Sequence, residues 1–147
     1  MSTGFFKVPK AKNEIVKSYR PGSPERKEVI ETYQKMMSSF TEVPMYINGK
    51  DVKSKGKKNI SPPHDHQKIV GEYYIAEPKH IDAAIDSALA AKENWENMSW
   101  ENRSAIFLKA AELIAGPYRS KINAATMIGQ SKTCLLYTSD AADDFVR

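Results

Sequence analysis

Cysteine is nearly missing from this sequence: Cys134 is the single example among 147 residues. One thiol excludes an internal disulfide framework and is typical of a protein in a reducing compartment. No run approaches the roughly 20 apolar residues that a membrane-spanning helix needs, and the residues up to Glu14 contain no continuous apolar segment of a secretory signal. We therefore expect a cytoplasmic protein that has no membrane partner.

Glycine motifs that hold phosphate groups are also missing. The spacing of the glycines matches neither the G-x-G-x-x-G motif nor a P-loop. The glycines considered are Gly49, Gly56, Gly71 and Gly129. The sequence itself therefore predicts no phosphate cradle.

Alanine-rich amphipathic sequence is abundant between Pro78 and Gln130. Pro78 is suited to the first position of a helix, Ser99 to the N-cap of a second, and Gly116-Pro117 to its end, with a third helix over residues 118–128. Apolar residues recur at helical spacing and predict buried stripes at Ile81, Ala84, Ile85, Ala88 and Leu89, and at Ile106 or Phe107, Ala110, Ala111, Leu113 and Ile114.

Shorter elements are expected before this region. Residues 1–20 read as an extended arm, and Ser23-Pro24 begins a helix that continues to Met37 and is closed by Pro44. Asn48-Gly49 predicts a type I′ hairpin over residues 45–52, because both central residues need a positive φ. Residues 53–58 read as a charged connection, residues 59–61 as a short strand and residues 68–75 as a longer one.

Two clusters of polar residues have a possible binding chemistry. His64 and His66, with His80, could share a metal, but a site needs three or four ligands, and a turn after Pro62-Pro63 is the favoured interpretation.

A run of lysines could bind phosphate groups. It lacks the aromatic or arginine residues that are interleaved in nucleic-acid-binding modules, so we favour a solvated hairpin edge. The run consists of Lys50, Lys53, Lys55, Lys57 and Lys58.

Trp95 and Trp100 flank the break between the first two long helices. They are better explained by packing between these helices than as a ligand platform. Cys134 has no base near it in sequence, so a nucleophilic role is not expected.

Several short motifs together resemble the N-terminal part of L-glutamate γ-semialdehyde dehydrogenases (1-pyrroline-5-carboxylate dehydrogenases) of the aldehyde dehydrogenase superfamily. The resemblance covers residues 13–132. Its motifs are Asn13-Glu14, Gly22-Ser23-Pro24-Glu25-Arg26, Tyr46-Ile47-Asn48-Gly49-Lys50, Ser61-Pro62-Pro63-His64-Asp65-His66, Ala88-Leu89-Ala90-Ala91-Lys92, Ile106-Phe107-Leu108-Lys109-Ala110-Ala111, Leu113-Ile114-Ala115-Gly116-Pro117-Tyr118-Arg119 and Ala125-Thr126-Met127-Ile128-Gly129-Gln130-Ser131-Lys132.

The resemblance implies an α/β fold, with N-terminal helices and a β-hairpin that open a Rossmann-like NAD-binding domain, truncated before its main sheet. It also implies NAD-dependent oxidation of glutamate γ-semialdehyde to glutamate in proline catabolism, with a small-molecule aldehyde substrate, by a parent enzyme that is a homo-oligomer. In the family a cysteine thiolate attacks the aldehyde and a glutamate activates water. Both lie beyond the matched region, so no catalytic, cofactor-binding or metal-binding residue is assigned here, and the fragment is expected to be inactive.

The sequence departs from the family after Lys132. The segment from Cys134 to Asp143 looks like the translation of a sequencing adapter, so residues 134–147 are interpreted as a non-native tail. Residues 1–44 are then an arm and short helix, and residues 45–133 the start of the NAD-binding domain. The short lead before Asn13 favours a monofunctional enzyme.

An alternative of a different class remains. The chain could be a small basic helical module, since its net charge is +4, with the hairpin recruiting an acidic partner or nucleic acid. Within the first interpretation, no nucleic acid partner is expected.

Overall fold

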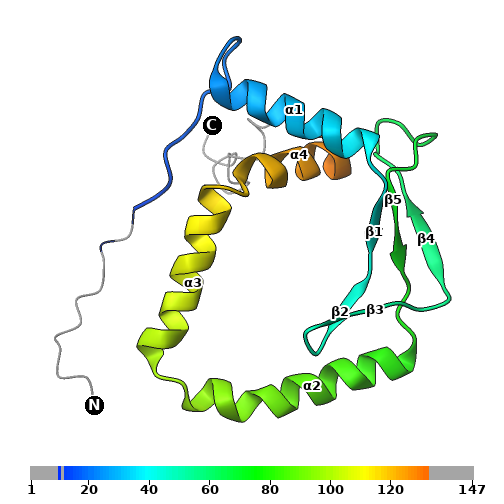
Figure 1. Ribbon diagram of the computed structural model, residues 1–147, viewed down its shortest axis with the longest axis vertical. Coiled ribbons are helices and arrows are strands. Elements are labelled where there is room, and N and C mark those ends of the chain that lie inside the picture. The colour runs from blue at the N-terminus through cyan, green and yellow to red at the C-terminus, as the bar shows by residue number, and fades with distance from the viewer. Residues whose placement is uncertain (1–9, 11, 133–147) are drawn as a thin grey trace, which may run out of the picture.

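The computed structural model describes Lys10 and residues 12–132. Within these residues it contains four helices and five short strands. Figure 1 shows them around an open frame, in which α1 and α4 run side by side, α3 and α2 form two further sides, and the strands form the last. The α/β class is confirmed, because helices are combined with a sheet that contains a parallel strand pair.

Helix α1 (Pro24–Ser38) begins as the sequence predicts. Ser23 is the N-cap, and its hydroxyl accepts a hydrogen bond from the Arg26 N–H at 3.4 Å. The helix packs along α4 (Arg119–Gln130), which is the most extensive helix–helix contact of the described chain. Val29 from α1 and Ala124 and Ile128 from α4 are buried, so this pair holds much of the small core.

A mixed sheet has the strand order β1-β5-β4, from β1 (Thr41–Val43), β5 (Gly71–Tyr74) and β4 (Lys57–Ile60). β1 runs parallel to β5, and β4 runs antiparallel to it. The sequence did not predict β1, because its three exposed residues show no alternation of burial and its partner lies 30 residues away at Thr41↔Gly71. Two boundaries were also wrong: β4 begins inside the predicted connection, and β5 is shorter than residues 68–75.

Gly71 is where two strands come unusually close together. A Cβ on Gly71 would lie 2.2 Å from the backbone oxygen of Thr41. Only a glycine fits this position, which keeps β1 hydrogen-bonded to the central strand.

The hairpin of β2 (Met45–Ile47) and β3 (Lys50–Val52) is confirmed. Asn48 has a φ of 51° and Gly49 a φ of 74°, as a type I′ turn requires. This two-stranded sheet touches α2, so it links the strands to the helical side of the frame.

The two longest helices also start where predicted. Pro78 is in the first turn of α2 (Pro78–Asn97), and the Ser99 hydroxyl accepts the Asn102 N–H at 3.3 Å at the start of α3 (Trp100–Ala115). Gly116 follows the last residue of α3, and α4 then begins one residue later than the predicted third helix.

The apolar stripes predicted on these helices are largely exposed in the described chain. Ile85 is 53% exposed and Phe107 is 66% exposed, and no residue of α3 is buried. The physical reason is a lack of partners, because α2 touches little beyond β2 and the start of α3, and α3 touches little beyond α4 and the end of α2. Both faces are therefore open to packing against further protein.

The predicted tail, residues 134–147, lies outside the described residues. The arm of residues 1–20 is described at Lys10 and from Lys12 onward, where it has no helix or strand.

Candidate functional site

His64 and His80 form hydrogen bonds within the described chain. His64 Nδ1 lies 2.7 Å from the Ser131 hydroxyl and its Nε2 lies 3.2 Å from the Tyr33 hydroxyl, while His80 Nδ1 accepts the Glu77 N–H at 3.0 Å. The turn is confirmed by the hydrogen bond from the Asp65 N–H to the Pro62 oxygen. Over the part of the chain that the structure describes, no three His, Cys, Asp or Glu residues gather as a metal site would need.

The lysine run is partly paired within the sheets. Lys53 forms an ion pair with Glu42, Lys57 forms one with Glu72, and both ammonium groups lie over the Tyr74 ring, at 5.5 and 4.9 Å from its centroid. The hydrogen bond from Lys53 lowers the pKa of the Glu42 carboxyl and raises the pKa of Lys53. Two of the five lysines therefore pair with carboxylates of β1 and β5. The predicted hairpin-edge position fits Lys50, which lies in β3, whereas Lys57 and Lys58 lie in β4 of the other sheet.

Trp95 packs between two helices as predicted. Its ring meets Phe107 of α3 edge-on, with centroids 6.3 Å apart. The Arg103 guanidinium donates to the Trp95 and Glu96 oxygens at 3.3 and 3.2 Å, which places a cation at the C-terminal end of α2. Trp100, by contrast, is 53% exposed.

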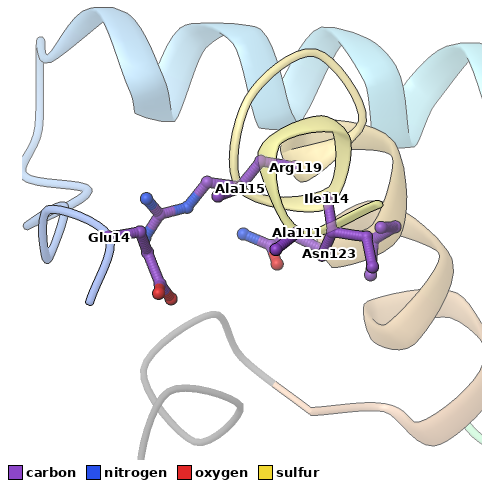
Figure 2. A pocket seen from close by; sticks show the side chains of 7 residues that line it. Glu14, Ala111, Ile114, Ala115, Arg119 and Asn123 are labelled. Carbon is purple, nitrogen blue, oxygen red and sulfur yellow. The ribbon is translucent and has the colours of Figure 1, made fainter. Parts of the chain in front are cut away.

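A pocket of about 310 Å³ lies where the arm meets the α3–α4 junction. Its walls are mostly apolar, with an acid, a guanidinium and an amide among the lining residues Glu14, Ala111, Ile114, Ala115, Arg119, Ile122 and Asn123. In Figure 2 the Arg119 side chain extends from α4 toward the arm, and the Asn123 amide points in the same direction.

Two hydrogen bonds tie the arm to α4 beside this pocket. Arg119 Nη1 donates to the Ile15 oxygen at 2.9 Å, and Asn123 Nδ2 donates to the Tyr19 hydroxyl at 2.7 Å. Arg119 and Asn123 are 8% and 5% exposed. Because the two residues are four apart, they lie on one face of α4.

Sequence reasoning missed this pocket. The one available signal was Arg119 itself, a cation in the first turn of a helix, where the helix dipole disfavours positive charge. The seven lining residues include no thiol, hydroxyl or imidazole. Cys134 lies outside the described residues.

None of the described helices is both long enough and apolar enough to cross a membrane.

The chain is similar to known proteins over most of its length. The model of the "Aldehyde dehydrogenase family" matches residues 50–143. Delta-1-pyrroline-5-carboxylate dehydrogenase from Agaricus bisporus is 43% identical over 93% of this chain and 25% of the relative. The mitochondrial human protein of the same name is 31% identical over 93% of this chain and 24% of the relative.

A solved structure gives the same correspondence. The delta-pyrroline-5-carboxylate dehydrogenase of Mycobacterium tuberculosis, crystallised with NAD and cobalamin, superposes with a TM-score of 0.83 at 34% identity. The match covers 88% of this chain and 25% of that protein. The chain thus spans about a quarter of the length of the relatives it matches. Since the family model covers more than half of its residues, the chain belongs to the aldehyde dehydrogenase family.

Proposed function

We propose that this chain supplies the opening part of the NAD-binding domain of an enzyme that oxidises L-glutamate γ-semialdehyde to L-glutamate with NAD. The observation that carries the proposal is the TM-score of 0.83, at 34% identity, to an enzyme crystallised with NAD. The aldehyde is then the small-molecule substrate of the whole enzyme. By the same resemblance, the whole enzyme is a homo-oligomer.

A chimera tests this function. Residues 12–132 replace the corresponding segment of the Mycobacterium tuberculosis enzyme, and NADH formation is followed with glutamate γ-semialdehyde and with an unbranched aliphatic aldehyde. We expect a folded chimera that prefers the semialdehyde. A chimera that melts cooperatively and binds NAD, yet oxidises only the aliphatic aldehyde, would contradict the assignment of substrate.

The 147-residue chain by itself is proposed to be inactive. Support comes from the lining of its pocket, which offers an acid, a guanidinium and an amide but no thiol, the group that attacks the aldehyde in this family. We expect no semialdehyde-dependent NADH formation from the purified chain. Turnover that disappears in a Cys134→Ala variant would overturn this proposal.

The division of the chain is likewise a proposal: an arm and helix in residues 1–44, the start of the NAD-binding domain in residues 45–133, and an adapter-derived tail in residues 134–147. The nucleotides that encode residues 134–143 test the tail. We expect these nucleotides to match a sequencing adapter. Unrelated codons would contradict the proposal of an adapter-derived tail.

We further propose that the chain has no nucleic acid partner, because Lys53 and Lys57 already pair with carboxylates. A basic binding module would lose affinity for polyanions steeply as salt rises. We expect the chain to be retained weakly on heparin, with no steep dependence on salt. Strong retention that falls steeply with salt would instead support a basic module that binds an acidic partner or nucleic acid.

For the cell compartment we propose the cytoplasm, supported by the single cysteine, which is typical of a reducing compartment. Several relatives carry the word mitochondrial in their names. Fractionation of cells that express the uninterrupted gene distinguishes the two compartments.

A further inference from the structure

Arg119 is a buried cation that pairs with no carboxylate of residues 12–132. It is 8% exposed, and its hydrogen bond within the described residues goes to the Ile15 backbone oxygen at 2.9 Å. Glu14 lines the same pocket but forms no ion pair with Arg119 there. A guanidinium has five N–H donors in a planar fork, so one carbonyl leaves most of its capacity unused.

The surroundings of Arg119 add a second requirement. Ala111, Ile114 and Ala115 from the end of α3, with Ile122 of α4, give the pocket an apolar floor. Asn123 also lines the pocket. Its amide nitrogen donates to the Tyr19 hydroxyl, so its oxygen remains able to accept. A ligand that suits both features has a carboxylate at one end and a short aliphatic chain at the other.

We infer that the pocket between the arm and the α3–α4 junction binds a small aliphatic carboxylic acid, with its carboxylate on the Arg119 guanidinium and its chain on the alanine and isoleucine floor. Guanidinium and carboxylate form two parallel charge-assisted hydrogen bonds, which are among the stronger polar contacts in proteins. Such a contact offsets the cost of burying the guanidinium. The volume of about 310 Å³ accepts a chain of several carbons.

Glu14 sets how tightly an acid binds. Its carboxylate lines the pocket, so it repels an anionic ligand that enters. With about eight non-hydrogen atoms, hexanoate is expected to bind with a Kd of about a millimolar, which fits a small ligand of modest efficiency. Removal of the Glu14 charge should lower this Kd severalfold.

The test uses the 147-residue chain with hexanoate, 1-hexanol and hexylammonium as probes, and follows thermal shift and the NMR signal of the Arg119 Nε–H. Hexanoate is expected to raise the melting temperature and to move this signal, while the alcohol and the amine do neither. An equal response to hexanoate and 1-hexanol would show that only the apolar floor binds, and would overturn the inference. Absence of any response to hexanoate at tens of millimolar would overturn it as well.

Three variants locate the site. Arg119→Lys keeps the charge but loses the planar fork, so hexanoate affinity should fall about tenfold or more. Arg103→Lys makes the same substitution at a guanidinium that caps α2, and should leave affinity unchanged. Glu14→Gln should strengthen binding, and its failure to do so would contradict the repulsion argument.

A variant that fills the pocket separates a loss of binding from a loss of fold. Ala111→Leu occupies the floor and leaves the Arg119–Ile15 contact in place, so it should abolish hexanoate binding while the circular dichroism spectrum is retained. Undiminished binding in this variant would place the ligand elsewhere and reject the pocket. The chimera assay above does not depend on this site, so the two proposals can fail separately.

Discussion

Gly71 shows how one missing side chain controls a strand pair. A Cβ there would meet the Thr41 oxygen at 2.2 Å, far inside contact distance and against backbone that cannot rotate away. We predict that Gly71→Ala separates β1 from β5 and costs about 1–3 kcal/mol of stability. Thermal melting followed by circular dichroism measures the loss.

Gly129 provides the matched control for this prediction. It lies inside α4, and a Cβ there would meet nothing within 4 Å. Gly129→Ala should stabilise the protein by up to about 1 kcal/mol, because glycine is a poor helix former. If both alanine variants melt alike, the close approach at Gly71 is not the cause.

The ionisation of Glu42 makes the stability of the fold depend on pH. The hydrogen bond from Lys53 lowers the pKa of its carboxyl from the ordinary 4.5. A lowered folded-state pKa means that the stabilisation is present above pH 4.5 and is lost as pH falls through the folded-state value.

Carboxyl NMR titration checks the cause of this shift. In a Lys53→Gln variant the midpoint of Glu42 should rise toward its ordinary value. Lys58→Gln removes a neighbouring charge that does not contribute to the shift, so the midpoint should not move. A midpoint that is the same in all three proteins would assign the shift to another cause.

At the scale of elements, the cap of α3 is the clearest single determinant. The Ser99 hydroxyl accepts the Asn102 N–H at 3.3 Å, and Glu101 adds negative charge in the first turn. Ser99→Ala should cost about 1 kcal/mol and shorten α3 at its start. Ser104→Ala, at an exposed position inside the same helix, should be neutral, and hydrogen exchange at the first turn distinguishes the two variants.

The elements that could be predicted from the sequence are those with local signals. Ser23, Pro78 and Ser99 start helices because a cap or a fixed φ acts within a single turn, and Asn48-Gly49 specifies its hairpin in the same local way. β1 and the pocket depend on residues far apart in sequence: Thr41 needs Gly71, and Arg119 needs Ile15. No local pattern reports such pairings, so these features could only be found in the structure.

For the whole molecule, the main property is uncovered apolar surface. Helices α2 and α3 carry apolar faces with few partners, and Leu89 and Phe107 are 63% and 66% exposed. Contiguous patches of this kind favour association. We predict that the isolated chain self-associates as its concentration rises.

Sedimentation velocity tests this prediction. Leu89→Glu and Phe107→Glu should each shift the distribution toward the monomer. Ala83→Glu adds the same charge to the side of α2 opposite the predicted stripe and should change little. A chain that stays monomeric at all concentrations, or that responds equally to Ala83→Glu, would show that these faces do not drive association.

The contact between the arm and α4 also orders events during synthesis. Arg119 lies 104 positions after the carbonyl that it binds. At ordinary translation rates the ribosome needs about 5–20 s to add that many residues, so the arm emerges long before its anchor exists. The backbone at Ile15 is therefore fixed in place only after α4 has been made, and a protease added to ribosome-bound nascent chains should cleave near Ile15 until α4 has left the exit tunnel.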